Sequence, residues 1–435
     1  MAVTGDTSTP HPGVPARAVP ARTGARSPRR PRPRILILLE NLPLARDARV
    51  RRESRALLDA GYDVTVICPR GDDVRIAREL PAVSLHSFRP PPAGRSAWGY
   101  VWEYLYASIA MAVLTAKVAV TEGFDAIQAC NPPDIFFAHA APFRLAGKPF
   151  VFDHHDLSPE LYTARSGKVG RLRTILEWLE RLTFRTADHV IATNESVRQV
   201  AIRRGRLAPS AVTVVRNGPE LVDGRCPQPA PSEPVTDARH LLVWLGVMGP
   251  DDGVDVALEA VAHLVHARGR RDVHAAFLGD GEWFAYLQGL ARELAIERYV
   301  SFPGWVEKET IERYLTQADI GLAPDPAGPR ADTATMMKVM DYQAYGLPVV
   351  AFDVHETRVS AGAAGVYVTG DRPEAYAEAI GTLLADPRRR HAMGATGRRR
   401  IEATLAWDRQ RPAYVAVYRG LLSGKEPADT RTVAQ

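Results

Sequence analysis

Short, nearly continuous apolar runs alternate with helical patterns along the first half of the chain. Runs of this kind are typical of parallel strands that helices cover on both faces. The predicted strands lie at 35–40, 63–69, 124–130, 149–154, 188–194 and 212–216. Helical patterns are found at 46–60, 133–146 and 168–186. The alternation of strand and helix predicts a doubly wound α/β domain.

A proline-rich segment at 223–237 follows this domain and is interpreted as a linker. Beyond it the alternation begins again, with predicted strands at 240–246, 273–278, 299–302, 319–323, 348–352 and 365–368. A chain of 435 residues is longer than one hydrophobic core usually supports. We therefore expect two Rossmann-like domains, whose ligands bind at the carboxyl ends of the strands in a cleft between them.

The net charge of +5 is carried by the N-terminal end of the chain. Residues 1–34 contain seven arginines and one acid, so the remainder is close to neutral. The segment lacks aromatic residues and an apolar signal-peptide core, which predicts a disordered Pro/Arg-rich tail. Its arginines are able to contact anionic lipid or another polyanion, although a solvated tail is the more frequent outcome. A neutral folded part does not indicate a nucleic-acid partner.

The cysteines indicate a reducing compartment. Cys68, Cys130 and Cys226 are widely spaced and form no CxxC pair, which argues against a disulfide framework or a zinc site. We therefore expect a cytoplasmic protein, with a position at the inner face of the cell membrane as the alternative.

The longest apolar stretch runs from Tyr104 to Ala116, between Glu103 and Lys117. It is shorter than the roughly 20 residues needed to span a bilayer. We interpret it as a buried helix, and a peripheral membrane contact is the other interpretation.

The segment 336–350 (MMKVMDYQAYGLPVV) combines charged residues with a predicted short helix. Lys338, Asp341 and Tyr345 have the i, i+3, i+7 spacing of one helical face. An acid can accept hydrogen bonds from ribose hydroxyls, and a lysine beside a helix N-terminus suits a diphosphate. The alternative is a surface ion pair between Lys338 and Asp341, which would stabilise the helix by a few tenths of a kcal/mol.

A second polar group, His154, His155 and Asp156, follows the apolar strand residues 149–153. A histidine at this edge can hydrogen-bond a sugar hydroxyl or a phosphate and orient it for reaction. Asn131 and Asn194 end other strands of the same domain and are expected to line the same edge.

Segments along most of the chain, from about Arg34 to Leu422, resemble family 4 of the nucleotide-sugar-dependent glycosyltransferases. The stretch from Ala318 to Asp353 carries the lysine, the acid and the Gly-x-Pro-Val-Val sequence of that family. Other segments agree in order and spacing: 41–69, 130–134 (CNPPD), 152–162 (FDHHDLSPELY), 192–196, 214–220, 245–255, 277–283 (FLGDGEW) and 302–305.

The resemblance implies the GT-B fold and a retaining transfer that needs neither metal nor cofactor. It implies a nucleotide-sugar donor in the C-terminal domain and an acceptor, a carbohydrate or a lipid-linked molecule, in the N-terminal domain. The catalytic residues would be His155 and Asp341. The donor site would comprise Lys338, Asp341, Gly246, Gly279, Thr335, Met337 and Arg358, and the acceptor site Arg49, Asn131, Asp156 and Glu160. The pathway would be cell-surface polysaccharide or glycolipid biosynthesis.

The same resemblance indicates how the chain is divided. The final helical pattern is expected to cross back onto the N-terminal domain. The resulting domain boundaries are 1–33 (tail), 34–222 (N-terminal domain), 223–237 (linker), 238–405 (C-terminal domain), 406–422 (crossing helix) and 423–435 (tail).

The chain departs from the family pattern at several positions. Thr333 stands where many members have the first of two glutamates, and Val247 and Met248 stand where many have a basic pair. The glycine pair after the first strand is replaced by residues 40–43 (ENLP). These departures leave two other functions open, a catalytically weak nucleotide-sugar-binding or scaffold protein and a GT-B nucleotide-sugar epimerase.

Overall fold

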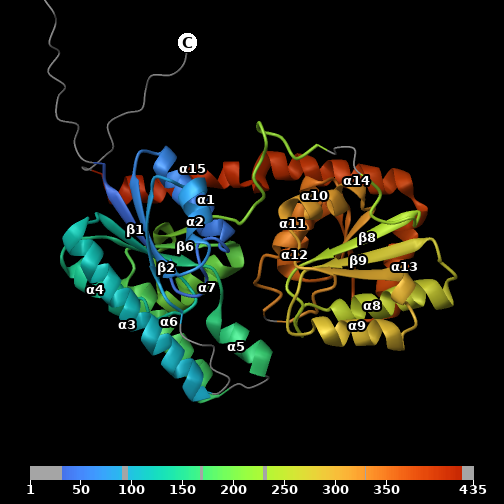
Figure 1. Ribbon diagram of the computed structural model, residues 1–435, viewed down its shortest axis with the longest axis horizontal. Coiled ribbons are helices and arrows are strands. Elements are labelled where there is room, and N and C mark those ends of the chain that lie inside the picture. The colour runs from blue at the N-terminus through green and yellow to red at the C-terminus, as the bar shows by residue number, and fades with distance from the viewer. Residues whose placement is uncertain (1–31, 91–96, 167–169, 229–232, 329, 424–435) are drawn as a thin grey trace, which may run out of the picture. The chain divides into compact units, whose positions relative to one another are not determined.

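Two parallel β-sheets organise the chain, one in each half (Figure 1). The structure, a computed structural model, describes residues 32–90, 97–166, 170–228, 233–328 and 330–423. Nearly all of the two predicted tails and part of the predicted linker lie outside the described residues.

The N-terminal sheet has seven strands in the order β3-β2-β1-β4-β5-β6-β7. Its strands are β1 Arg34–Leu39, β2 Asp63–Pro69, β3 Val83–Phe88, β4 Ala126–Cys130, β5 Phe150–His154, β6 His189–Ala192 and β7 Val212–Val214. The helices are α1 Ala48–Asp59, α2 Asp73–Glu79, α3 Ala97–Thr121, α4 Phe137–Leu145, α5 Ser158–Ser166, α6 Arg171–Thr186 and α7 Glu195–Gly205. The strand order is that of a Rossmann-like domain, in which the order reverses between β1 and β4.

The C-terminal sheet repeats this plan with six strands in the order β10-β9-β8-β11-β12-β13. Its strands are β8 His240–Leu245, β9 Val273–Leu278, β10 Val300–Gly304, β11 Ile320–Ala323, β12 Val349–Phe352 and β13 Gly365–Val368. The helices are α8 Val254–Ala262, α9 Phe284–Glu293, α10 Lys308–Gln317, α11 Met337–Ala344, α12 His355–Ala361, α13 Pro373–Ala385, α14 Pro387–Arg400 and α15 Trp407–Leu421. The chain therefore contains the two Rossmann-like domains expected from the sequence.

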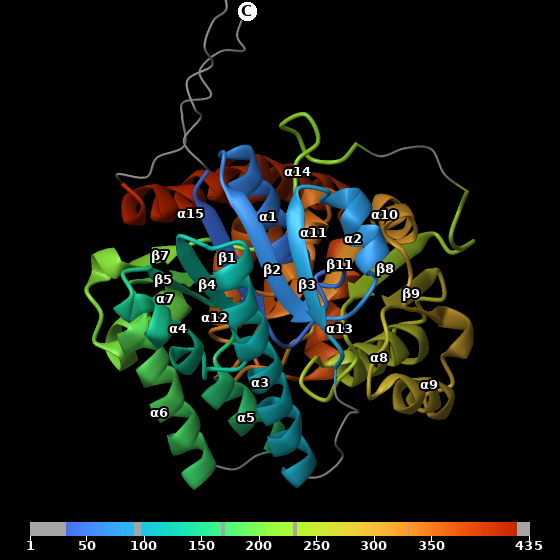
Figure 2. The ribbon, with the colours of Figure 1, turned by 60° about the vertical axis from the view of Figure 1, so that its left-hand side comes forward.

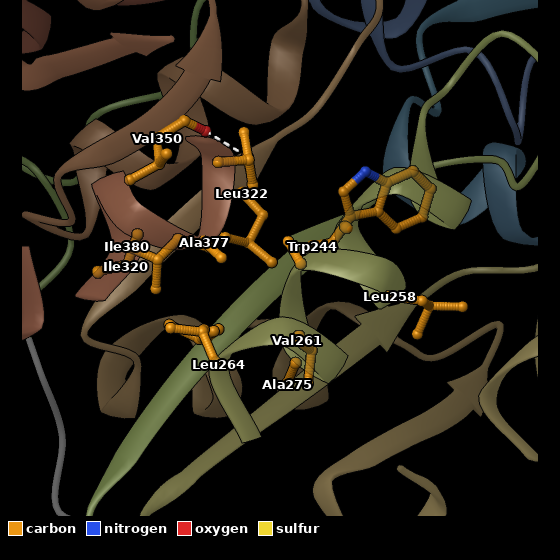
Figure 3. Packing of buried hydrophobic residues seen from close by; sticks show 14 of the residues in the cluster. Trp244, Leu258, Val261, Leu264, Ala275, Ile320, Leu322, Val350, Ala377 and Ile380 are labelled. Atoms are coloured by element: carbon orange, nitrogen blue, oxygen red, sulfur yellow. Dashed lines mark hydrogen bonds between the residues drawn. The ribbon is translucent and has the colours of Figure 1, made fainter. Parts of the chain in front are cut away.

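The core of the C-terminal domain shows why its strands are apolar without interruption. Side chains of β8, β9, β11 and β12 pack against α8 and α13 on one face of the sheet (Figure 3). The residues labelled there are Trp244, Leu258, Val261, Leu264, Ala275, Ile320, Leu322, Val350, Ala377 and Ile380. A second cluster, with Val243, Val339 and Val349, fills the opposite face. Strands that are buried on both faces need apolar side chains at consecutive positions.

Every predicted strand is present, whereas the strand β3 and the helices α2, α5 and α7 were missed. β3 (VSLHSF) is an edge strand whose first five residues are only half-buried, so polar side chains are tolerated and no apolar run appears. Helix α4 begins at Phe137 rather than at Pro133, after a run of two prolines.

The final helix α15 packs on the N-terminal domain, as expected. Trp407, Tyr414 and Tyr418 belong to the same apolar cluster as Ile35 and Val50. The hydroxyl groups of Tyr414 and Tyr418 both donate to Gln128 Oε1, Tyr414 at 2.8 Å. The C-terminal end of the chain thus completes the core of the first domain.

The interpretation of 104–116 as a buried helix is wrong. Among the described residues one helix, over Trp102–Thr121, is long and apolar enough by composition to cross a membrane, and only 22% of its most apolar stretch is buried. One side of this helix, which belongs to α3, packs on the sheet through Ala107, Met111 and Val118. The other side exposes large apolar residues.

Candidate active site

The polar residues predicted in the N-terminal domain lie along one edge of its sheet. β4 ends just before Asn131 and β5 just before His155, while Asn194 follows β6. Cys130 is in register with Asp153, and His154 with Ala192. Because the three strands are parallel neighbours, Asn131, His155 and Asn194 follow one another at the carboxyl edge of the sheet.

Of the two adjacent histidines, His155 is the one that reaches the surface. Its Nε2 atom lies 2.5 Å from Asp153 Oδ2, and its main-chain N–H donates to Asn131 Oδ1 at 2.6 Å. His154 is completely buried between Phe152 and Phe184, with Nε2 3.4 Å from Glu180. His154 therefore has a structural position, and His155 is the candidate for chemistry.

A buried cluster of charged residues, Arg49, Glu53 and Asp153, contacts the ring of His155 through Asp153. Arg49 donates from Nη2 to Asp153 Oδ1 at 2.7 Å and lies 2.9 Å from Glu53. Burial would raise the pKa of Asp153, but Arg49 and His155 lower it well below the ordinary value. Burial and the charge of Asp153 raise the pKa of Glu53 well above its ordinary value. Asp153 is thus held ionised, in position to accept a hydrogen bond from His155.

Arg49 is placed beneath the site rather than on its surface. The side chain is almost completely buried, and Nη1 also donates to Val215 O at 2.9 Å and to Asn217 Oδ1 at 2.7 Å. Together with the bonds to Asp153, these contacts mean that each guanidinium nitrogen of Arg49 already donates a hydrogen bond to the protein. The structure gives Arg49 a supporting role instead of the predicted contact with an acceptor.

Two other residues predicted to bind the acceptor are also engaged with the protein. Asn131 is buried and donates from Nδ2 to Asp134 Oδ1 at 2.8 Å and to Asp156 O at 2.6 Å. Glu160, on α5, accepts from Arg204. Asp156 is exposed at the edge of the sheet. Of the predicted acceptor residues, Asp156 is therefore the one whose side chain is open to solvent.

In the C-terminal domain, Lys338 and Asp341 do not form the surface ion pair that was the alternative interpretation. Lys338 is 8% exposed and donates from Nζ to Asp325 Oδ1 at 2.8 Å, and Asp325 is 1% exposed. The ammonium group also lies 5.0 Å from the centre of the Trp244 ring. The second oxygen of Asp325, Oδ2, is buried without a hydrogen-bond partner. Lys338 thus belongs to a buried ion pair at the carboxyl end of β11.

Asp341 is a half-buried carboxyl group that makes no hydrogen bond or ion pair with the residues that the structure describes. Burial raises the pKa of Asp341 to about 6, and the charge of Arg52 on α1 opposes the rise. A carboxylate that is largely removed from water is costly unless it is paired or hydrogen-bonded. Asp341 is therefore placed to accept hydrogen bonds from a ligand.

Hydrogen bonds join the start of α11 to the edge that carries His155. Asn194 donates from Nδ2 to Thr335 Oγ1 at 2.9 Å and to Thr333 O at 2.7 Å. Met337, the first residue of α11, is exposed. The predicted donor residues Thr335 and Met337 therefore lie close to the carboxyl end of β6.

The two glycines predicted to bind the donor also have a packing role. A Cβ atom on Gly279 would lie 1.8 Å from Gly246 O, and one on Gly246 would lie 2.9 Å from the ring of Trp244. Both glycines have positive φ values. The turns after β8 and β9 thus require glycine for their close approach, whether or not a ligand is bound.

Arg358 is not brought to this group of residues. It is an exposed residue of α12 that donates to Asp353 Oδ1 at 2.8 Å and stacks on Tyr367 at 4.2 Å. Among the described residues, neither of these partners forms a hydrogen bond or ion pair with Lys338 or Asp341.

Sequence reasoning missed Arg330, which the structure places near the donor residues. Burial raises the pKa of Asp252, and the charges of Lys338 and Arg330 oppose the rise. Arg330 is half-buried and forms no ion pair with another described residue. It stands in the loop between β11 and α11, where a cation can replace the basic pair that is absent at Val247 and Met248.

Two acids near the edge were missed as well. Glu40 follows β1, and burial together with the charge of Glu103 raises its pKa to about 7. Glu356, on α12, is buried and accepts from Ser196 Oγ at 2.6 Å. The position of Glu40 directly after a buried strand was a usable sequence signal. Burial there perturbs the carboxyl group, and perturbed carboxyl groups often mark functional sites. Nothing local distinguishes Glu356.

Cys130, Asp153 and His155 bring three potential ligand atoms within 4.8 Å of one another. A cation there would have to compete with the guanidinium group of Arg49, which already neutralises Asp153. Burial and the charge of Asp153 also raise the pKa of the Cys130 thiol well above its usual range, which disfavours the thiolate that metals bind. These residues do not fit a metal site.

Two surface cavities lie at the opposite edges of the sheets. One of about 660 Å³ is lined by residues that precede β5 and β6, including Lys148 and Asp188. The other, of about 470 Å³, is lined by residues that precede β8, β9 and β11, including Arg239 and Asp319. Both are at the amino ends of strands, away from the carboxyl ends where parallel α/β sheets bind ligands.

Comparison with known proteins gives matches in both halves of the chain. Residues 47–221 match the family described as Glycosyltransferase Family 4, and residues 239–386 match Glycosyl transferases group 1. The GDP-mannose-dependent alpha-(1-6)-phosphatidylinositol monomannoside mannosyltransferase of Mycolicibacterium smegmatis is 33% identical over 195 residues, which are 44% of this chain and 49% of that protein. The D-inositol 3-phosphate glycosyltransferase 1 of Catenulispora acidiphila is 29% identical, over 65% of this chain and 69% of that protein. The match thus spans about half the length of the first relative.

Solved structures share the fold. Sucrose-phosphate synthase from Thermosynechococcus elongatus superposes with a TM-score of 0.69 at 17% identity, covering 90% of this chain and all of that one. Anabaena HepE in complex with UDP and glucose gives a TM-score of 0.67 at 16% identity, covering 89% of this chain and 99% of that one. Both halves of the chain therefore match glycosyltransferase families, with family 4 matched over residues 47–221, and the chain has the two-domain fold known as GT-B.

Proposed function

We propose that the protein transfers a sugar from a nucleotide-sugar donor to a hydroxyl group of an acceptor, with retention of the anomeric configuration and without a metal ion. The observation that carries the proposal is the state of Asp341. It is a half-buried carboxyl group without a protein partner among the described residues, and it lies on α11, whose start is hydrogen-bonded to the N-terminal domain.

The donor nucleotide would bind to the C-terminal domain. Asp341 would accept hydrogen bonds from the ribose hydroxyl groups, which are charge-assisted when the carboxyl group is ionised. The diphosphate would meet the free main-chain N–H groups at the start of α11 and the positive charge of Arg330. Lys338, whose ammonium group is paired with Asp325 at 2.8 Å, would donate a further hydrogen bond to the diphosphate.

The transfer would take place between this donor and the edge that carries His155. The bond from the anomeric carbon to the diphosphate oxygen breaks, and its electron pair leaves with the diphosphate. The acceptor hydroxyl oxygen forms the new bond on the same face of the sugar, and its proton passes to the diphosphate. His155 would orient the sugar: with Nε2–H donating to Asp153, Nδ1 is the ring atom left to accept from a sugar hydroxyl.

Relatives leave the nucleotide base undecided. The mycobacterial relative is named as GDP-mannose-dependent, and HepE was solved with UDP and glucose. Thermal-shift measurements with UDP, GDP, ADP and dTDP would identify the base, since a nucleotide at 100 times its Kd adds about 2.7 kcal/mol to the free energy of unfolding. No shift with any of the four would contradict the proposal.

Incubation with the matching nucleotide-sugars then separates the alternative functions. A transferase releases the nucleoside diphosphate and makes a new glycoside when an acceptor is present. An epimerase converts the donor sugar without an acceptor, and a binding or scaffold protein gives the thermal shift without turnover. The transferase result is expected because His155 is held at the reacting edge by two independent contacts.

A further inference from the structure

Helix α3 has an apolar outer face, which is unusual for a helix on the surface of a domain. Trp102, Leu105, Ile109, Val113 and Val120 are all exposed, Trp102 to 62%. Their spacing places them on one stripe of the helix, which runs for about 27 Å at a rise of 1.5 Å per residue. A surface helix normally turns a polar face to water, and a helix that is apolar all round is covered by protein or lipid.

Helix α6 exposes a second apolar group. Leu172, Ile175 and Trp178 are exposed at successive turns, Trp178 to 56%. The same side of the helix carries exposed arginines at its beginning and end, Arg171 and Arg185. We call the exposed apolar residues of α3 and α6, together with these arginines, the α3–α6 surface.

The first turns of α3 and α6, at one end of the α3–α6 surface, lie on the side of the domain that carries the candidate active site. Glu103, in the second turn of α3, is close enough to Glu40 after β1 to raise its pKa. Arg173, in the first turn of α6, lies 3.6 Å from Glu160 on α5, the helix that follows His155. Figure 2 shows α3 and α6 running in the same direction, with their first turns extending beyond the sheet.

The chemistry of this surface fits a phospholipid bilayer. Tryptophan is favoured at membrane interfaces, where its ring is buried and its N–H stays in contact with water. Arginines beside an apolar face add attraction to anionic headgroups. A bilayer crossing does not fit, because Ala107, Met111 and Val118 on the inner side of α3 pack into the domain.

We propose that the α3–α6 surface docks on an anionic phospholipid bilayer and lays the edge that carries His155 against it, so that the acceptor is a lipid-linked molecule. The choice of acceptor class rests on the proposed transfer function, and the docking itself does not. Docking would bury apolar side chains that now face water.

Sedimentation with lipid vesicles tests the docking. The full chain is expected to bind vesicles that contain phosphatidylglycerol and to bind phosphatidylcholine vesicles less well. The double variant Ile109→Glu/Val113→Glu should lose about tenfold or more in vesicle affinity, because it places two charges in the contact. Val74→Glu is the matched control, since Val74 is an equally exposed apolar residue of α2, outside the surface.

The outcomes are distinct. Equal vesicle binding by the double variant and the wild type would overturn the proposal and assign any binding to another part of the chain. Absence of vesicle binding by the wild type would overturn it as well. A dimer in sedimentation velocity that the double variant abolishes, without vesicle binding, would show that a second copy covers the surface.

Nucleotide binding distinguishes this proposal from the proposed function. The double variant should show the same thermal shift with the matching nucleoside diphosphate as the wild type. With vesicles of total membrane lipid, labelled sugar from the donor should appear in a product that organic solvent extracts. The double variant should form less of this labelled product than the wild type. If the label is found only in a water-soluble product, the assignment of a lipid-linked acceptor is wrong. If the wild type binds no nucleoside diphosphate, the proposed function is wrong instead.

Discussion

Replacement of Lys338 by methionine should separate the stability of the C-terminal domain from donor binding. The ammonium group is paired with Asp325 at 2.8 Å, and both side chains are less than one tenth exposed. Removal of one partner leaves a buried charge, which costs about 3–5 kcal/mol. A domain of this size loses about 2–4 °C per kcal/mol, so the Tm of Lys338→Met should fall by roughly 6–20 °C.

The double variant Lys338→Met/Asp325→Leu removes both charges and fills a similar volume. Its free energy of unfolding should return to within about 1 kcal/mol of the wild-type value, since buried pairs are often replaced by apolar residues without loss of stability. Lys308→Met is the matched control: Lys308 is 82% exposed, its carboxylate partner Glu312 is 3.6 Å away, and its loss should change stability by less than about 1 kcal/mol.

Calorimetric titration of the double variant then measures the role of Lys338 in binding. Loss of the hydrogen bond that the ammonium group would donate to the diphosphate should weaken the binding of nucleoside diphosphate by about 1.5–3 kcal/mol and leave the binding of the nucleoside unchanged. If the single variant melts like Lys308→Met, the reasoning about the buried pair is wrong. If the double variant is stable and binds the diphosphate as tightly as the wild type, Lys338 has only a structural role.

Three further predictions concern the chemistry. Burial raises the pKa of Asp341 from 3.8 to about 6, so between these pH values the folded protein holds a proton that the unfolded chain has lost. The free energy of unfolding should therefore fall as the pH rises from about 4 to about 6. A plot of Tm against pH should lose this slope in Asp341→Asn, and an unchanged slope would contradict the assignment. His155→Ala should lower kcat by about 10²-fold with little change in nucleotide affinity, and near-normal kcat in the folded variant would move the role to another residue. Saturating EDTA should leave turnover largely intact, and a complete loss that Mg²⁺ restores would refute transfer without a metal.

Local pattern was sufficient for most of the fold. Twelve of the thirteen strands in the described part of the chain could be predicted, because a strand buried on both faces needs consecutive apolar side chains and this requirement is visible within a few residues. β3 escaped because an edge strand is only half-buried. The position of His155 at the carboxyl edge of the sheet also followed from local pattern, since it stands at the end of a buried strand of a parallel sheet.

The partners of the charged residues were decided only by the tertiary structure. Lys338 has Asp341 three residues away on its own helix but pairs with Asp325 across the fold, and Arg49 meets Asp153, 104 residues further along the chain. The exposure of α3 was equally invisible, because an apolar helix has the same sequence whether protein, lipid or water faces its outer side. Sequence determines which groups a segment offers, and long-range packing determines what each group meets and how far it is removed from water.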